Sequence, residues 1–149
     1  MKLLVCVDGS VPSNKAIEKA IEIASGCRVD QITLISVYEK YPLPLIEHAS
    51  FSAMEEEMNH YEEMNKRVIT DHEAILEKAS TRFKNEGITT ETLLKEGHPA
   101  DTIAQTAEKL GVDMIVMGNR GRGGLKKLLL GSVSNAVIQE THASVLVVK

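Results

Sequence analysis

The segment from Val112 to Val137 limits the possible folds more than any other part of the sequence. An apolar run, Asp113–Met117, is followed by a loop with four glycines between Gly118 and Gly124, and Gly131-Ser132 then precedes a helical pattern. Glycine lets the main chain approach a ligand without obstruction by a Cβ atom, and free N–H groups at a helix start attract negative groups. The segment therefore predicts a strand, an anion-binding loop and a helix, and it indicates a small ligand that carries phosphate.

Short apolar runs of the kind that form buried parallel strands recur along the chain. They lie at Leu3–Val7, Ile32–Val37, Met114–Met117 and Val145–Val148, with a weaker alternating run at Thr89–Leu94. Helical patterns lie between them, and two of these end at the candidate capping glycines Gly26 and Gly111. The alternation predicts an α/β fold, a three-layer open twisted parallel sheet of five strands with four helices, in a Rossmann-like arrangement. The length of 149 residues fits a single domain over residues 1–149.

The middle of the chain is less regular. Tyr41–Pro44 begins an extended loop, and apolar residues from Met54 to Phe83 then recur at helical spacing. This spacing predicts one long amphipathic helix of roughly 30 residues, about 45 Å in length, with one end that projects or packs on a partner. The acidic run Glu55–Glu57 is interpreted as its solvated face and not as a metal site.

Charge and apolar content exclude several classes of function. The formal net charge is −4, so nothing favours nucleic acid or an anionic membrane surface as a partner. The apolar run at the start is too short for a signal peptide, and no later run reaches membrane-spanning length, which predicts a cytoplasmic protein. Cys6 and Cys27 lack metal-ligand spacing and are interpreted as reduced thiols without a role.

The turn after the first strand, Asp8-Gly-Ser-Val-Pro-Ser13, permits two interpretations. Asp8 or Ser10 fits a helix cap, and Asp8 also fits a contact with a ribose or with a metal through water. The turn lacks the G-x-G-x-x-G fingerprint, and the loop after Gly118 lacks the lysine of a Walker loop. A phosphoacceptor receiver domain would need an Asp after the third strand, where this chain has Lys95-Glu96.

The pattern Gly118-x-x-Gly121, nine residues and then Gly131-Ser132 resembles the signature of the nucleotide-binding members of the universal stress protein family. The resemblance extends over nearly the whole chain. It includes Val5-Cys-Val-Asp-Gly-Ser10, Gly97-His-Pro-Ala100, Leu129-Leu-Gly-Ser132 and the closing Ser144–Val148. It implies the adenine nucleotide alpha hydrolase-like type of Rossmann-like fold.

The same resemblance implies the positions of a nucleotide's parts. Asp8 would lie near the ribose or the metal, the main chain around Val37 would meet adenine, and Met117 and Gly118 would border the ribose. The implied phosphate contacts are Gly121, Gly131, Ser132, Val133 and Ser134. Free donors and the dipole at a helix start favour negative charge there by a few tenths to about 1 kcal/mol. The basic side chains Arg120 and Arg122 are assigned no role.

We therefore expect a cytosolic ATP-binding stress-response or signalling module, with AMP as an alternative ligand. One alternative is a slow ATPase in which Asp8 and Ser132 hold Mg²⁺ or Mn²⁺, and another is a partner-binding protein without nucleotide. No nucleophile or general base can be assigned, because no His pairs with a Cys or Ser at readable spacing. An apolar last strand at a sheet edge would also expose unpaired main-chain groups, so Val145–Val148 predicts a homodimer.

Overall fold

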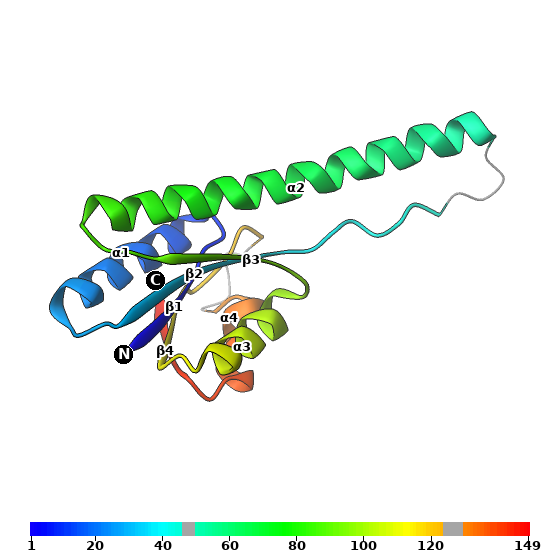
Figure 1. The fold of residues 1–149 in the computed structure, drawn as a ribbon. Coiled ribbons are helices and arrows are strands. Elements are labelled where there is room, and N and C mark those ends of the chain that lie inside the picture. The colour runs from blue at the N-terminus through cyan, green and yellow to red at the C-terminus, as the bar shows by residue number, and fades with distance from the viewer. Residues whose placement is uncertain (46–49, 124–129) are drawn as a thin grey trace.

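The chain forms a parallel sheet between two layers of helices (Figure 1). The computed structural model describes residues 1–45, 50–123 and 130–149. Within this part, the strands are β1 (Lys2–Cys6), β2 (Gln31–Tyr38), β3 (Glu91–Glu96), β4 (Met114–Gly118) and β5 (Ser144–Val148), and the helices are α1 (Val11–Gly26), α2 (Phe51–Asn85), α3 (Pro99–Leu110) and α4 (Ser132–Glu140). The predicted α/β fold with five parallel strands and four helices is confirmed.

Both faces of the sheet are covered by helices, which explains why its strands are continuous apolar runs. In β1, Leu3 and Val5 point into one core, which α1 and α2 cover. Leu4 and Cys6 point into a second core, which α3 and α4 cover. Leu3, Leu4 and Val5 are fully buried, so β1 is the central strand of the fold.

The strand order β3-β2-β1-β4-β5 places a topological switch between β1 and β4. From β1 the chain builds outward through β2 and β3, and it then returns to the other side of β1 to add β4 and β5. In open parallel sheets, ligands bind beyond the carboxyl ends of the two strands at such a point. The loops after β1 and β4 therefore define where a site is expected.

Helix α2 is the predicted long helix, and it is longer than its sequence pattern indicated. Its 35 residues span about 52 Å at 1.5 Å per residue. The carboxyl-terminal half packs on the sheet through the buried residues Leu76, Ala79 and Phe83, whereas the amino-terminal half extends well beyond the sheet (Figure 1). The prediction that one end projects is confirmed. No helix among the residues described is long and apolar enough to cross a bilayer.

Two predicted element ends differ from the structure. Gly26 is the last residue of α1 and not its cap, since Cys27 occupies the cap position with an extended backbone. Gly111 does cap α3, with a left-handed φ of 60°. The weak run predicted at 89–94 forms a strand two residues later, because pairing with β2 starts at Glu91 opposite Thr33.

Candidate functional site

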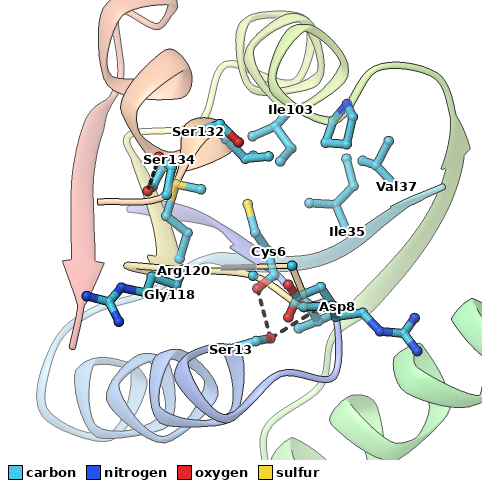
Figure 2. A pocket seen from close by; sticks show the side chains of 18 of the residues that line it. Cys6, Asp8, Ser13, Ile35, Val37, Ile103, Gly118, Arg120, Ser132 and Ser134 are labelled. Carbon is cyan, nitrogen blue, oxygen red and sulfur yellow. Dashed lines mark hydrogen bonds between the residues drawn. The ribbon is translucent and has the colours of Figure 1, made fainter. Parts of the chain in front are cut away.

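A cavity of about 400 Å³ lies at the carboxyl ends of β1, β2 and β4 (Figure 2). The loop after β1, the loop after β4 and the start of α4 form one part of its wall, and residues of β2 and α3 form another. All nine residues that the sequence resemblance implied as ligand contacts line this cavity. They come from four separate segments of the chain, so the fold brings together residues that are far apart in the sequence.

The turn after β1 holds Asp8 in a fixed position. Asp8 Oδ1 accepts a hydrogen bond from the Ser10 N–H at 2.9 Å, and the Asp8 N–H donates to Ser13 Oγ at 3.1 Å. Ser10 is the N-cap of α1, because its hydroxyl oxygen accepts from the Ser13 N–H. The helix is therefore capped by Ser10, and the carboxylate of Asp8 remains at the cavity.

Two glycines in the β4 loop permit close contact with the β1 loop. A Cβ atom added to Gly118 would lie 2.7 Å from the carbonyl carbon of Pro12 and 2.9 Å from the Ser13 nitrogen. A Cβ atom added to Gly121 would lie 2.7 Å from Asp8 Oδ2. Sequence reasoning attributed these glycines to the approach of a ligand. The structure shows that they also let the two loops pack against each other.

Asn119 closes the loop between β4 and α4 at its base, and the sequence gave no indication of this role. Its carbonyl oxygen accepts hydrogen bonds from the Gly131 N–H at 2.7 Å and from Ser134 Oγ at 3.1 Å. Its N–H donates to the Val148 carbonyl at 2.7 Å. These contacts join segments that are distant in sequence, so no local spacing could predict them. They fix the start of α4 next to the end of β4.

The start of α4 presents main-chain donors to the cavity. Gly131 is the N-cap, with φ −74° and ψ 164°, and Ser132 is the first helical residue. Gly131, and not Ser132, is the cap, because Gly131 has the extended backbone of a cap. The first main-chain bond of the helix runs from the Asn135 N–H to Gly131 O at 3.0 Å. The N–H groups of the three residues before Asn135 thus belong to the unpaired first turn, where the helix dipole is positive.

The two serines at this helix start differ in what they offer a ligand. The Ser134 hydroxyl lies within hydrogen-bond distance of Asn119 O and Gly131 O, and the residue is 2% exposed. Its hydroxyl hydrogen is therefore used within the protein, and its N–H is the group left for an anion. Ser132 lines the cavity and its hydroxyl makes no hydrogen bond to another described residue, so both its hydroxyl and its N–H are placed for a ligand.

Another part of the cavity wall is apolar. Ile35 and Val37 from β2 and Ile103 from α3 line it (Figure 2). Cys6 belongs to this wall, and burial, with a smaller effect from the Asp8 charge, raises the pKa of its thiol to about 12. The thiol is therefore neutral and acts as a small apolar group. An apolar part of a ligand would pack on this surface.

Charged groups at the cavity are few among the residues described. Asp8 is the one carboxylate in the described lining, while Arg120 and Arg122 bring positive charge from the β4 loop. The sequence assigned no role to these arginines, and the structure places both of them in the cavity lining. No group of three His, Cys, Asp or Glu side chains within the described part could hold a metal ion. Any metal here would therefore need further oxygen ligands from water or from the bound molecule.

The doubly wound sheet, the cavity at its switch point and the open helix start define an α/β protein with a candidate small-molecule site. The family model of the universal stress protein family matches residues 1–149. Universal stress protein YxiE of Bacillus subtilis is 33% identical over 149 residues, which cover 99% of this chain and 98% of that protein. The chain belongs to the universal stress protein family.

Solved structures show the same fold. The structure of protein MJ0577 of Methanocaldococcus jannaschii superposes with a TM-score of 0.79 at 24% identity, covering 99% of this chain and 94% of that one. A universal stress protein solved in complex with cAMP superposes with a TM-score of 0.67 at 25% identity, covering 100% and 96%. The second structure shows that an adenine nucleotide binds to a relative with this fold.

Proposed function

We propose that the cavity binds an adenine nucleotide, with its base in the apolar part and its phosphates at the start of α4. ATP is the expected ligand, and AMP is the alternative. The observation that carries the proposal is the position of Ser132, Val133 and Ser134 at the cavity wall, in the first turn of α4, where their N–H groups have no main-chain partner among the described residues. A helix start of this kind binds phosphate through its donors and its dipole. The cAMP complex of a relative supports the choice of an adenine nucleotide.

The proposed assignment of residues is the one that the family resemblance implies, applied to this cavity. The main chain around Val37 meets the base, Met117 and Gly118 border the ribose, and Asp8 lies near the ribose or a phosphate-bound metal. The phosphates contact Gly121, Gly131, Ser132, Val133 and Ser134. Asp8 and Ser132 lie on opposite sides of the cavity wall, on the loop after β1 and on α4 (Figure 2). A Mg²⁺ or Mn²⁺ ion that accompanies the nucleotide would take one of these two side chains as a ligand, and water and phosphate oxygens would supply the others.

We propose a signalling or stress-response role in the cytoplasm in which nucleotide binding changes a partner surface. The surface is the loop between Gly118 and Gly131, of which residues 124–129 lie outside the described part of the chain. A nucleotide that binds one arrangement of this loop more tightly shifts the population toward it. The free energy available for this shift equals the difference between the nucleotide's binding free energies for the two arrangements.

We also propose a homodimer through β5. This strand pairs with β4 on one side and forms an edge of the sheet, so its other side presents main-chain N–H and C=O groups. A two-fold partner would pair with that edge. The variant Val147→Lys should give monomers by light scattering with an unchanged circular dichroism spectrum, whereas a dimer that persists would refute this interface.

Titration calorimetry with ATP, AMP and adenosine tests the binding function. We expect heat with at least one nucleotide and weaker binding of adenosine, because adenosine lacks the phosphates that α4 holds. Heat denaturation of the purified protein, followed by chromatography of the supernatant, detects nucleotide that was already bound. If no nucleotide gives heat and none is released, the chain is a partner-binding protein and the proposal is wrong.

A further inference from the structure

His72 is the one histidine among the described residues of the cavity wall, and neither the sequence pattern nor the proposed function uses it. It lies in α2, on the half of that helix that packs on the sheet. Its Nδ1 atom lies 2.8 Å from Ser36 Oγ, and Ser36 Oγ lies 2.8 Å from the Val7 carbonyl oxygen. Ser36 is fully buried, so the hydroxyl that joins these two contacts is shielded from water.

The chain of contacts fixes the tautomer of the imidazole. A carbonyl oxygen only accepts, so the single hydroxyl hydrogen of Ser36 points to Val7 O. Ser36 Oγ must then accept a hydrogen from His72 Nδ1. In the neutral imidazole, Nε2 carries no hydrogen and is an acceptor.

The environment keeps this imidazole neutral. Burial lowers the pKa of His72 below its ordinary value of 6.5, and the positive charge of Arg122 lowers it further. The carboxylates of Asp71 and Asp8 act in the opposite direction with smaller effect. The Tyr38 ring packs at a tilt on the imidazole, with the centroids 6.0 Å apart. At neutral pH the cavity therefore contains a hydrogen-bond acceptor at this position.

The position of His72 associates it with the base and not with the phosphates. Its partner Ser36 directly precedes Val37 at the carboxyl end of β2, whereas the phosphate donors lie at the start of α4. Ile35, Val37 and Ile103 line the cavity from the face of the sheet that α3 and α4 cover, whereas His72 reaches the cavity from α2 on the other face. A half-buried acceptor with a fixed tautomer discriminates between ligands, because a ligand without a matching donor leaves it unpaired.

We propose that His72 is a specificity-determining residue, whose Nε2 accepts a hydrogen bond from an amino group on the bound base. The site then favours a 6-aminopurine over a 6-oxopurine, which presents a carbonyl oxygen at the same place. Ser36 acts as a positioning residue, because it holds the tautomer that leaves Nε2 as the acceptor. This inference depends on the proposed nucleotide function, since it assigns a further contact in the same cavity.

The test compares ATP with ITP, which differs from ATP in having a 6-oxo group in place of the 6-amino group. Affinities are measured by calorimetry at about pH 8 for the natural protein, His72→Phe and His72→Gln. We expect the natural protein to prefer ATP by about tenfold or more. His72→Phe should reduce this preference to about twofold or less, and His72→Gln should restore part of it through its amide oxygen. His60→Phe, on the projecting half of α2, is the matched control and should keep the natural preference.

Two further measurements separate the possible outcomes. Ser36→Ala should reduce the ATP preference without removing it, because the imidazole then samples both tautomers. 2′-Deoxy-ATP tests for a ribose contact. If His72→Phe abolishes the difference in affinity between ATP and 2′-deoxy-ATP but keeps the preference for ATP over ITP, the assignment to the base is wrong.

The inference is also overturned if the ratio of ATP affinity to ITP affinity is the same in the natural protein and in a folded His72→Phe variant. Nucleotide binding would then remain established. If the natural protein binds neither nucleotide, both this inference and the proposed function fail.

Discussion

Asp8 and Gly121 approach each other so closely that a Cβ atom at residue 121 would lie 2.7 Å from Asp8 Oδ2. The other carboxylate oxygen of Asp8 is held by the Ser10 N–H. The contact joins the loop after β1 to the loop after β4 at the cavity, so the carboxylate cannot move without changing the site. The relationship explains why a glycine is needed at position 121, apart from any ligand.

The variant Gly121→Ala should therefore affect binding more than stability. The added methyl group displaces the Asp8 carboxylate, which is the end of a side chain and moves at lower cost than the main chain. We expect about a tenfold loss of nucleotide affinity by calorimetry, from the misplacement of a cavity group. Gly123→Ala, in the same loop, is the control, since a Cβ atom there meets no atom of the described residues within 4 Å. Equal affinity in both variants would contradict the role of this contact.

Gly118→Ala should reduce the stability of the fold more than it reduces nucleotide affinity. Its Cβ atom would lie 2.7 to 2.9 Å from main-chain atoms of Pro12 and Ser13, which cannot move without shifting the start of α1. Overpacking of this kind costs about 1–3 kcal/mol in the free energy of unfolding, measured by urea denaturation. Gly26→Ala, at an open position, should be neutral or stabilising. A stability loss that is the same for both variants would show that the packing between β4 and α1 does not require Gly118.

The two cysteines should react at very different rates. Cys27 is exposed, whereas Cys6 is buried and its pKa is raised to about 12. Because the thiolate is the reactive form, Cys6 should stay unmodified in the native protein. Titration with a thiol reagent at about pH 8 should modify one thiol in the native protein and two in guanidinium. Rapid modification of two native thiols would show that the cavity wall opens readily.

His72 should contribute to the dependence of stability on pH. Its folded-state pKa is lowered from 6.5, so the unfolded chain binds the proton more readily. Its contribution to the free energy of unfolding is complete above the unfolded-state pKa of 6.5 and is lost as the pH falls through the lowered folded-state pKa. Urea denaturation at about pH 7.5 and about pH 5.5 measures this loss.

The matched variants separate His72 from other titrating groups. His72→Gln should lose less stability between the two pH values than the natural protein does, whereas His60→Gln should lose as much as the natural protein. If His72→Gln and the natural protein lose the same amount, His72 does not titrate differently in the folded and unfolded states.

The fold could be predicted from the sequence because its signals are local. Continuous apolar runs such as Leu3–Val7 indicate strands covered on both faces, and the helical patterns between them indicate parallel crossovers. The predicted ends of helices and strands were less accurate where pairing between strands determines the end. The start of β3 at Glu91 depends on its register with β2, which no local pattern encodes.

The candidate site could be predicted only in part. The glycine pattern and the resemblance selected nine residues, and the fold brings all of them to one cavity. Asn119 and His72 were missed, because each acts through partners distant in the sequence, such as Val148 and Ser36. The packing role of Gly118 was missed for the same reason. Their roles depend on tertiary contacts and not on spacing.

The central claim is that main-chain N–H groups at the start of α4 hold the nucleotide's phosphates, and Ser132 allows a direct test. Proline is well tolerated at the first position of a helix, and Gly131, with φ −74° and ψ 164°, already has the backbone that precedes proline. Ser132→Pro therefore removes one N–H and the hydroxyl, whereas Ser132→Ala removes the hydroxyl alone.

Calorimetry with ATP and with adenosine on these two variants is the most direct measurement. We expect Ser132→Pro to bind ATP about tenfold or more weakly than Ser132→Ala, because a hydrogen bond to a charged phosphate contributes about 1.5–3 kcal/mol. Adenosine should bind equally to both variants, since it lacks phosphate. If the two folded variants bind ATP with the same affinity, the N–H of residue 132 does not contact the phosphates and the account is contradicted.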